Sequence, residues 1–254
     1  MLQRSATMRV ALIFEVRMRQ DVHTAGIPVL CVSCEARHKG VCSALKPAQL
    51  VELSRYASRQ HLQRGQEMVG DTESVTTYSN ILTGVAKLSK TMADGRQQIV
   101  GLQFAPDFLG RPYDPESRLD VEAATELHVC SFPRTIFDRM MEQTPGLEKR
   151  VFQQTLRELD EARDWMLTLG RKTATEKIAS FLLLIARNIN PGSTEQAVSF
   201  DLPLQRADIA DFLGLTIETV SRQLTRLATQ GVIKVQNRHI EVPDIERLSV
   251  FSGG

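Results

Sequence analysis

Near the end of the chain, a short amphipathic helix, a glycine turn and a second amphipathic helix follow one another. Residues 206–213 make the first helix, and Gly214 can adopt the left-handed backbone that a tight turn requires. The second helix is predicted over residues 216–230, with apolar residues at intervals of three and four on its buried face: Val220, Leu224 and Leu227. Two helices joined by so short a turn are typical of a helix-turn-helix. Strand-like segments at 232–235 and 239–242 add a β-wing, so the pattern predicts a winged helix-turn-helix.

Several polar residues of the second helix are candidates for contact with DNA, because the N-terminal part of that helix enters the major groove in such motifs. Arg222 can donate two hydrogen bonds to a guanine, Glu218 can accept from a cytosine, and Ser221 suits several bases. Thr219 and Arg226 are candidate phosphate contacts. Glu218 and Arg222 are also spaced to form an ordinary ion pair on the helix surface.

The overall charge limits how DNA could be held. A net charge of +1 over 254 residues argues against binding by bulk electrostatics, which needs a strongly basic face. Binding would therefore depend on placed contacts and on dimerisation. No apolar run approaches the roughly 20 residues that span a bilayer. We therefore expect a cytoplasmic protein with no membrane partner. Residues 1–30 are expected to form a disordered or weakly ordered extension.

The central part of the chain alternates between β-like segments and turns. A helix is predicted over residues 47–59, and short strand-like runs then recur between turn signals from about 60 to 135. Asp94-Gly95 is the best candidate for a hairpin. Thr173 and Glu176 have the spacing of a capping box at the start of a later helix. These features predict an antiparallel roll or sandwich, followed by helices.

A long helix is predicted over residues 145–170. It carries a seam with alternating spacings of three and four, typical of a two-stranded coiled coil: Phe152, Thr155, Leu159, Ala162, Met166 and Leu169. The alternative is a helix that packs only on its own domain. The seam is narrow and is flanked by charged residues, which favours a dimer helix. Asp160, Glu161 and Asp164 would then repel their counterparts across a dimer axis unless the seam packs well.

The four cysteines form a candidate metal site. Cys31, Cys34 and Cys42 lie close together in the sequence, and Cys130 lies in a predicted strand. In a reducing compartment, clustered cysteines favour metal binding or redox chemistry over disulfides. Four thiolates suit either tetrahedral zinc or an iron–sulfur cluster, and the spacing leaves both open.

Two other interpretations compete with a four-cysteine site. A local zinc site could use Cys31, Cys34, His38 and Cys42 and leave Cys130 unused. Cys130 could also be a small buried apolar residue. Strand alternation argues against the latter, because it places Cys130 on the face opposite Val129.

With these residues in hand, the chain resembles the FNR group of the CRP/FNR regulators. The resemblance is strongest over residues 213–222, over residues 95–101 and 107–110, and at the four cysteines. It implies an α+β fold with an N-terminal antiparallel β-roll (31–144), a long dimerisation helix (145–170) and a C-terminal winged helix-turn-helix (171–254). It also implies an oxygen-labile [4Fe–4S] cluster on four ligands: Cys31, Cys34, Cys42 and Cys130.

In regulators of this group, the dimer that holds the cluster binds DNA and recruits RNA polymerase, and oxygen degrades the cluster and loosens the dimer. The resemblance assigns base reading to Glu218, Ser221 and Arg222, and implies a TTGAT-N4-ATCAA-like palindrome that controls genes for low-oxygen metabolism. The implied protein is a regulator and not an enzyme. An alternative is a zinc-stabilised regulator of the same family that senses another signal.

The chain departs from the family pattern at two places. Seven residues separate Cys34 from Cys42, a longer interval than in the best-known FNR proteins but similar to that of α-proteobacterial members. Cyclic-nucleotide-binding relatives carry Gly-Glu-Leu and then Arg-Ser or Arg-Thr, whereas here Gly110 is followed by Arg111 and Pro112. We therefore expect no cyclic nucleotide to bind.

Overall fold

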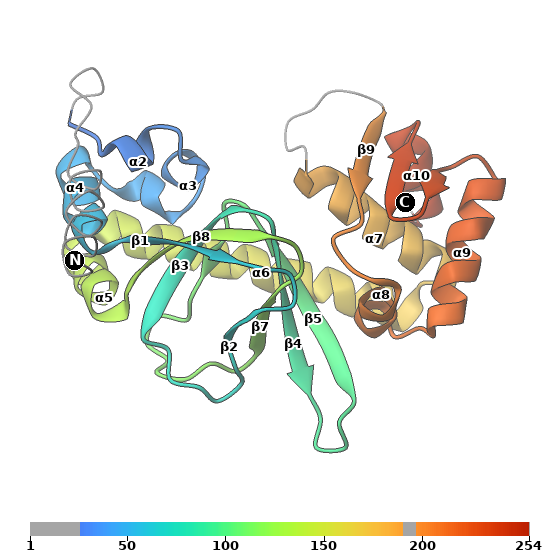
Figure 1. Ribbon diagram of the computed structural model, residues 1–254, viewed down its shortest axis with the longest axis horizontal. Coiled ribbons are helices and arrows are strands. Elements are labelled where there is room, and N and C mark those ends of the chain that lie inside the picture. Colours follow the sequence, from blue (N-terminus) through green and yellow to red (C-terminus); the bar gives the residue numbers. More distant parts are fainter. Residues whose placement is uncertain (1–25, 190–196, 254) are drawn as a thin grey trace, which may run out of the picture.

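The computed structural model describes residues 26–189 and 197–253, and Figure 1 shows its arrangement. A β-roll lies beside a group of short N-terminal helices, one long helix runs behind the roll, and a smaller helical domain with a three-stranded sheet lies at the far end. Residues 1–25 of the predicted N-terminal extension lie outside the described part. Within the described ranges, no helix is long and apolar enough to cross a membrane.

Two antiparallel four-stranded sheets form the roll, which confirms the predicted antiparallel architecture. The strand orders are β1-β8-β3-β6 and β2-β7-β4-β5. The strands are β1 (Ser58–Leu62), β2 (Glu67–Val69), β3 (Thr77–Thr83), β4 (Val85–Thr91), β5 (Gln97–Phe104), β6 (Phe108–Leu109), β7 (Asp120–Ala123) and β8 (Leu127–Pro133). The predicted hairpin joins β4 to β5, where Gly95 has a φ of 85° that favours glycine. Apolar side chains such as Ile81, Leu127 and Val129 fill the space between the sheets.

Short helices precede the roll: α2 (Val29–Val32), α3 (Glu35–His38), the 3-10 helix η1 (Val41–Ala44) and α4 (Pro47–Tyr56). The helix predicted to reach residue 59 ends at Tyr56. Ala57 already has an extended backbone, and Ser58 pairs with Ser131 of β8, so sheet pairing ends the helix. Helix α5 (Arg134–Gln143) was not predicted, and its Phe137 stacks on Phe132 at 4.9 Å between ring centroids.

The predicted long helix is α6 (Pro145–Arg171), and one of its faces packs on the roll. Leu147 and Val151 are buried in the same apolar cluster as the aromatic side chains of the roll and α5. Gln154 is also buried, and its Nε2 donates to the main-chain oxygen of Phe108 at 3.3 Å. The opposite face of α6 remains exposed.

The C-terminal domain contains α7 (Ala174–Ile189), β9 (Val198–Asp201), α8 (Arg206–Leu213), α9 (Ile217–Thr229), β10 (Lys234–Gln236), β11 (His239–Val242) and α10 (Ile245–Phe251). The predicted capping box precedes α7, where the Thr173 amide donates to the Glu176 carboxylate at 2.7 Å. The strand order β10-β11-β9 gives the predicted wing a third strand. Helix α10 was not predicted.

The roll and the C-terminal domain share one apolar cluster. Roll residues such as Val85, Ile99 and Phe104 pack in it together with residues of α7, α8 and α9. At the edge of this contact, Nζ of Lys87 on β4 lies 3.0 Å from Asp208 of α8 and 2.9 Å from Glu122 of β7. The two domains are therefore joined by burial and by an ion pair that links a strand of the roll to a helix of the helix-turn-helix.

Candidate functional site

Local contacts fix both ends of the turn before α9. Gly214 ends α8 in the left-handed conformation (φ 61°, ψ 44°), as predicted. Thr216 is the N-cap of α9, and its hydroxyl accepts a hydrogen bond from the Thr219 amide at 3.2 Å. Such a cap satisfies one of the amides that a helix start leaves without a partner. The predicted first residue of the helix is therefore its cap, and the start of α9 is held by its own sequence.

Helix α9 has one buried and one exposed face. The buried face carries the three predicted apolar residues: Val220, Leu224 and Leu227. Glu218, Ser221, Arg222 and Arg226 are exposed, whereas Thr219 is partly buried and its hydroxyl lies 3.1 Å from that of Thr216. The structure thus places the predicted DNA-contacting residues on the exposed side of a helix whose other side is anchored in the core.

The charged groups at the start of α9 are kept apart. The Glu218 carboxylate is held by its own main-chain amide and by the Thr216 hydroxyl, and these hydrogen bonds lower its pKa, so it is ionised at neutral pH. Nη2 of Arg222 instead donates to the Thr219 hydroxyl at 3.4 Å. No ion pair joins Glu218 to Arg222, although both lie in the described part of the chain. Both groups therefore remain available to an external partner.

The exposed face of α6 carries an apolar stripe. Phe152 is 61% exposed and Met166 72%, and Leu159 is also exposed. Two further leucines, Leu156 and Leu167, are exposed although they were not part of the predicted seam. The stripe otherwise includes the predicted Thr155 and Ala162, whereas the predicted Leu169 is partly buried. The exposed stripe is therefore displaced around the helix relative to the predicted seam, because α6 packs on the roll through its opposite side.

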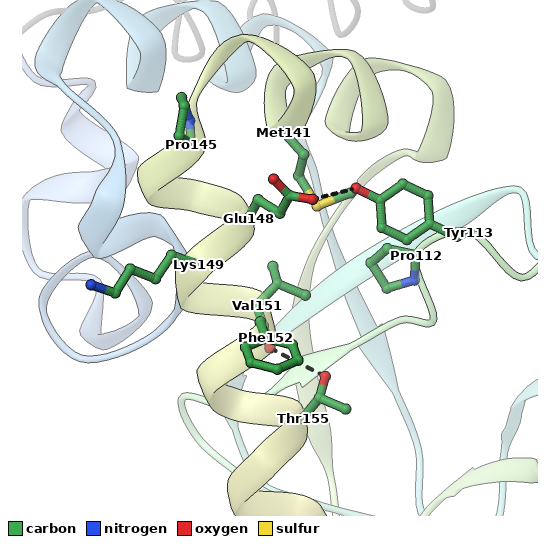
Figure 2. Close-up of a pocket in the computed structure, with 9 residues that line it drawn as sticks. All are labelled: Pro112, Tyr113, Met141, Pro145, Glu148, Lys149, Val151, Phe152 and Thr155. Atoms are coloured by element: carbon green, nitrogen blue, oxygen red, sulfur yellow. Dashed lines mark hydrogen bonds between the residues drawn. The ribbon is translucent and has the colours of Figure 1, made fainter.

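Beside Phe152, the stripe opens into a hollow of about 480 Å³, shown in Figure 2. Tyr113 and Pro112 of the roll lie opposite the N-terminal half of α6, and the Tyr113 hydroxyl donates to the Glu148 carboxylate at 3.1 Å. The Thr155 hydroxyl donates to the main-chain oxygen of Val151 at 3.2 Å, so its polar group is satisfied within the helix. The N-terminal half of the seam is therefore continuous with an apolar hollow.

The acidic residues around the predicted seam, Asp160, Glu161 and Asp164, are all exposed. Asp160 pairs with Arg163 of the same helix at 3.1 Å. Although Glu161 is exposed, desolvation of its carboxyl group raises its pKa, and the nearby Asp107 raises the pKa further. The repulsion of these acidic residues across a dimer axis remains a prediction.

The four cysteines come from separate elements. Cys31 lies in α2, Cys34 is the N-cap of α3, and Cys42 lies in η1. Cys130 lies in β8, on the sheet beside which these short helices are arranged (Figure 1). None of the four forms a disulfide. The fold therefore brings a distant strand cysteine to the N-terminal cysteine segment.

Electrostatic interactions link Cys42 with the three other thiols. Cys42 is buried, and its pKa is raised first by that burial and then by the charges of Cys130, Cys34 and Cys31. Burial and the neighbouring Cys34 raise the pKa of Cys31 to about 11, while Arg37 and Arg59 oppose that rise. Across the described ranges, no three His, Cys, Asp or Glu side chains already form a group that could hold a metal ion. The thiols are gathered, but they are not yet arranged as ligands.

Two residues beside the thiols were missed by the sequence analysis. Asn80 is the register partner of Cys130 across β3 and β8, and its Nδ2 donates to Sγ of Cys42 at 3.3 Å. Its Oδ1 is buried without a hydrogen-bond partner. Arg59 is the partner of Cys130 on the other side, in β1, and its Nη2 donates to the main-chain oxygen of Leu30 at 3.0 Å. Only the strand register identifies these residues, and a single sequence does not reveal that register.

His38, the fourth member of the alternative local zinc site, is exposed. Its Nε2 lies 2.9 Å from Nη2 of Arg37 and 3.4 Å from the main-chain oxygen of Val32. The thiols that raise the pKa of Cys42 include Cys130. Cys130 therefore lies near the N-terminal cysteines, and the choice between the four-cysteine set and the local set remains a prediction.

A cavity of about 650 Å³ lies between the roll and α6, and its lining includes Glu73, Leu88 and Arg111 of the roll and Leu159 of α6. Arg111 lies 3.6 Å from Asp114, which neutralises part of its charge. The expectation that no cyclic nucleotide binds remains a prediction.

A β-roll followed by a long, half-exposed helix and a winged helix-turn-helix is the architecture of a class of DNA-binding transcription regulators. Residues 176–251 match the model of the Crp-like helix-turn-helix domain. The chain is 56% identical over 231 residues to a probable transcriptional activator of Rhizobium leguminosarum bv. viciae, covering 91% of this chain and 96% of that protein. It is 43% identical to the transcriptional activator protein FnrL of Cereibacter sphaeroides, covering 88% of this chain and 92% of that protein.

The solved structure of FixK2 from Bradyrhizobium japonicum superposes with a TM-score of 0.71 at 32% identity, covering 78% of this chain and 98% of that chain. The nitrogen fixation regulation protein FixK of Bradyrhizobium diazoefficiens is 37% identical, covering 87% of this chain and 93% of that protein. The chain belongs to the CRP/FNR family of transcriptional regulators. This confirms the predicted family, the fold class and a regulatory rather than enzymatic role.

Proposed function

We propose that this protein is an oxygen-responsive transcriptional activator that holds a [4Fe–4S] cluster and binds palindromic DNA as a homodimer. In this proposal, residues 31–144 form the sensor domain, residues 145–170 the dimerisation helix and residues 171–254 the DNA-binding domain. The observation that carries the proposal is the gathering of all four cysteines of the chain, one of them from a distant strand, beside one surface of the roll.

The residues at the thiol site fit an iron–sulfur cluster. Cys31, Cys34, Cys42 and Cys130 would hold it, and four thiolates are its usual ligand set. Hydrogen bonds to the sulfurs tune such clusters, and Asn80 already donates one to Cys42. Arg37 and Arg59 supply positive charge beside Cys31. When bound, the cluster would supply an oxygen-sensitive link between the N-terminal segment and the sheet.

The exposed face of α6 supports a homodimer. A stripe that includes Phe152, Leu156, Leu159 and Met166 would otherwise remain in contact with water. Pairing two such helices buries the stripe and brings two α9 helices to one DNA molecule. Two half-sites bound together gain affinity through effective concentration, so loss of the dimer strongly weakens DNA binding.

The exposed face of α9 supports sequence-specific reading. Glu218, Ser221 and Arg222 would contact bases, and Thr219 and Arg226 would contact phosphates, on a TTGAT-N4-ATCAA-like palindrome. The names of the similar proteins, a probable transcriptional activator and FnrL, support activation, which would require contact with RNA polymerase.

Anaerobic purification tests the proposal. The iron and zinc content, the visible absorbance, the sedimentation coefficient and the affinity for the palindrome would be measured before and after admitting air. We expect a coloured protein with about four iron atoms per chain that loses colour, dimer and DNA affinity together in air. A colourless protein with about one zinc per chain and air-independent DNA binding would overturn the oxygen sensor and support the zinc-stabilised regulator.

A further inference from the structure

Arg150 of α6 holds the backbone of the cysteine segment. Its Nη2 donates to the main-chain oxygen of Lys39 at 2.6 Å, and its Nε donates to that of Gly40 at 3.4 Å. These two carbonyls directly precede Val41 and Cys42 of η1. A single guanidinium thus bridges the dimer helix and the segment that leads to the buried cysteine. Hydrogen bonds with a charged donor are stronger than neutral ones.

The segment held by Arg150 has little room to move. A Cβ atom at Gly40 would lie 2.9 Å from both Cα of Ala36 and the main-chain oxygen of Pro106, closer than real Cβ contacts allow. Gly40 is therefore wedged between α3 and the loop after β5. The Gly40 carbonyl also accepts from the hydroxyl of Ser43 within η1 at 2.7 Å, so the Arg150 side chain is the contact that links this carbonyl to α6. A displacement of η1 would therefore act on the Arg150 side chain.

Arg150 and Phe152 project from opposite sides of the same helix. At 3.6 residues per turn, two positions along an α-helix are separated by about 200°. Phe152 is 61% exposed on the apolar stripe, whereas Arg150 faces the cysteine segment. The N-terminal half of α6 therefore touches the cysteine segment with one side and offers its apolar stripe with the other.

We propose that Arg150 is the positioning residue through which the state of the cysteine segment sets the packing of α6 in the dimer. It acts through the carbonyls of Lys39 and Gly40. This inference rests on the proposed function, because the cysteine segment changes state only if its thiols hold a metal centre. Loss of that centre frees η1 and weakens the Arg150 contact. The position of α6 then changes, and with it the packing of the apolar stripe that contains Phe152.

The test compares Arg150→Met, Arg150→Lys and the control Arg171→Met, which removes the same charge from the other end of α6. The dimer dissociation constant is measured by anaerobic sedimentation, with the cluster present and after its removal by a chelator. In the wild-type protein, cluster loss weakens the dimer. In Arg150→Met we expect wild-type iron content, but a response to cluster loss that is smaller by roughly tenfold, from the loss of a charge-assisted contact. Arg150→Lys keeps part of the response, and Arg171→Met keeps all of it.

Two results would overturn the proposal. One is an Arg150→Met variant that responds to cluster loss as the wild-type protein does. The other is a variant that loses its iron, because Arg150 would then only support the cysteine segment.

A wild-type protein without iron would instead refute the proposed function, and the inference is then tested in metal-free protein. Hydrogen exchange in residues 39–44 should become faster in Arg150→Met while the dimer weakens. Faster exchange with an unchanged dimer would contradict a coupling role, since it would show that the contact does not reach the seam.

Discussion

The start of α9 and the cysteine segment are the two candidate recognition sites, and only the start of α9 is stabilised by contacts within its own sequence. Helix α9 has a threonine cap, a left-handed glycine before it and a buried face that anchors it. Helices α2 and α3 each contain four residues and have no side-chain cap. Nucleating so short a helix is unfavourable without outside contacts. The start of α9 is therefore fixed by its own contacts, whereas the short helices of the cysteine segment depend on contacts from outside that segment.

The largest effect should follow from changes at the thiol site. Replacing Cys130 with Ser keeps the size of the side chain but removes one thiolate from the strand side. We expect nearly complete loss of iron, together with loss of the air-sensitive dimer, while far-UV circular dichroism stays unchanged. The metal content of anaerobically purified protein measures this. If the variant kept its full iron content, Cys130 would not be a ligand, and the local set with His38 would return as the favoured site.

A smaller loss is expected at the DNA-reading surface. Arg222→Ala should reduce affinity for the palindrome by about 1–3 kcal/mol and relax the base preference at one position of each half-site. Fluorescence anisotropy with single-base variants of the palindrome measures both effects. Arg226→Ala is the matched control, because loss of a phosphate contact weakens all sequences alike and lowers the salt dependence. An Arg222→Ala variant with an unchanged base preference would remove that residue from base reading.

A change at the N-cap of α9 tests how much the local contacts of this helix stabilise it. Thr216→Ala removes the hydroxyl that accepts from the Thr219 amide and should lower the free energy of unfolding by about 1 kcal/mol. Urea denaturation of the metal-free protein would measure this, and Thr225→Ala, on the exposed side later in the same helix, serves as control. Equal losses in both variants would mean that the cap contributes nothing particular.

The smallest effect concerns α6, the helix between the two regions. Glu158 is exposed as a residue, but desolvation of its carboxyl group raises its pKa, so its ionised form is disfavoured in the folded state. The associated stability is fully present below the ordinary value of 4.5 and is lost as pH rises through the raised value. Glu158→Gln removes this cost and can still accept the hydrogen bond from Gln154. We expect a modest gain in urea midpoint at neutral pH and none at acidic pH, and an equal gain at both would contradict the titration.

How far the sequence predicted the molecule differs between its regions. Elements with strong periodicity or clear turns, such as α6, α9 and the β4–β5 hairpin, lie where they were predicted. Helices α5 and α10 were missed, since each contains only ten residues or fewer and has no pattern that separates it from its neighbours. Leu156 was absent from the predicted seam because a spacing pattern does not say which side of a helix its own domain covers.

The thiol site was predicted only as a set of ligands. Cys130 was recognised from strand alternation, but Asn80 and Arg150 were not, because each reaches the cysteine segment through tertiary contacts. The position of Asn80 depends on the strand register, and the position of Arg150 depends on how α6 packs on the rest of the chain. Neither is encoded in local spacing, so residues that support a site are harder to predict than the candidate ligands themselves.

The apolar cluster shared by the roll and the C-terminal domain has a consequence for how such proteins can be recombined. Val85, Ile99 and Phe104 belong to the sensor by sequence, but they help to cover the helices that carry the DNA reader. A chimera that joined this C-terminal domain to a foreign sensor at residue 171 would expose that surface and leave Asp208 without Lys87. A stable chimera would have to carry the residues of the β4–β5 hairpin that pack on the C-terminal domain. The unit that can be exchanged is therefore larger than the helix-turn-helix.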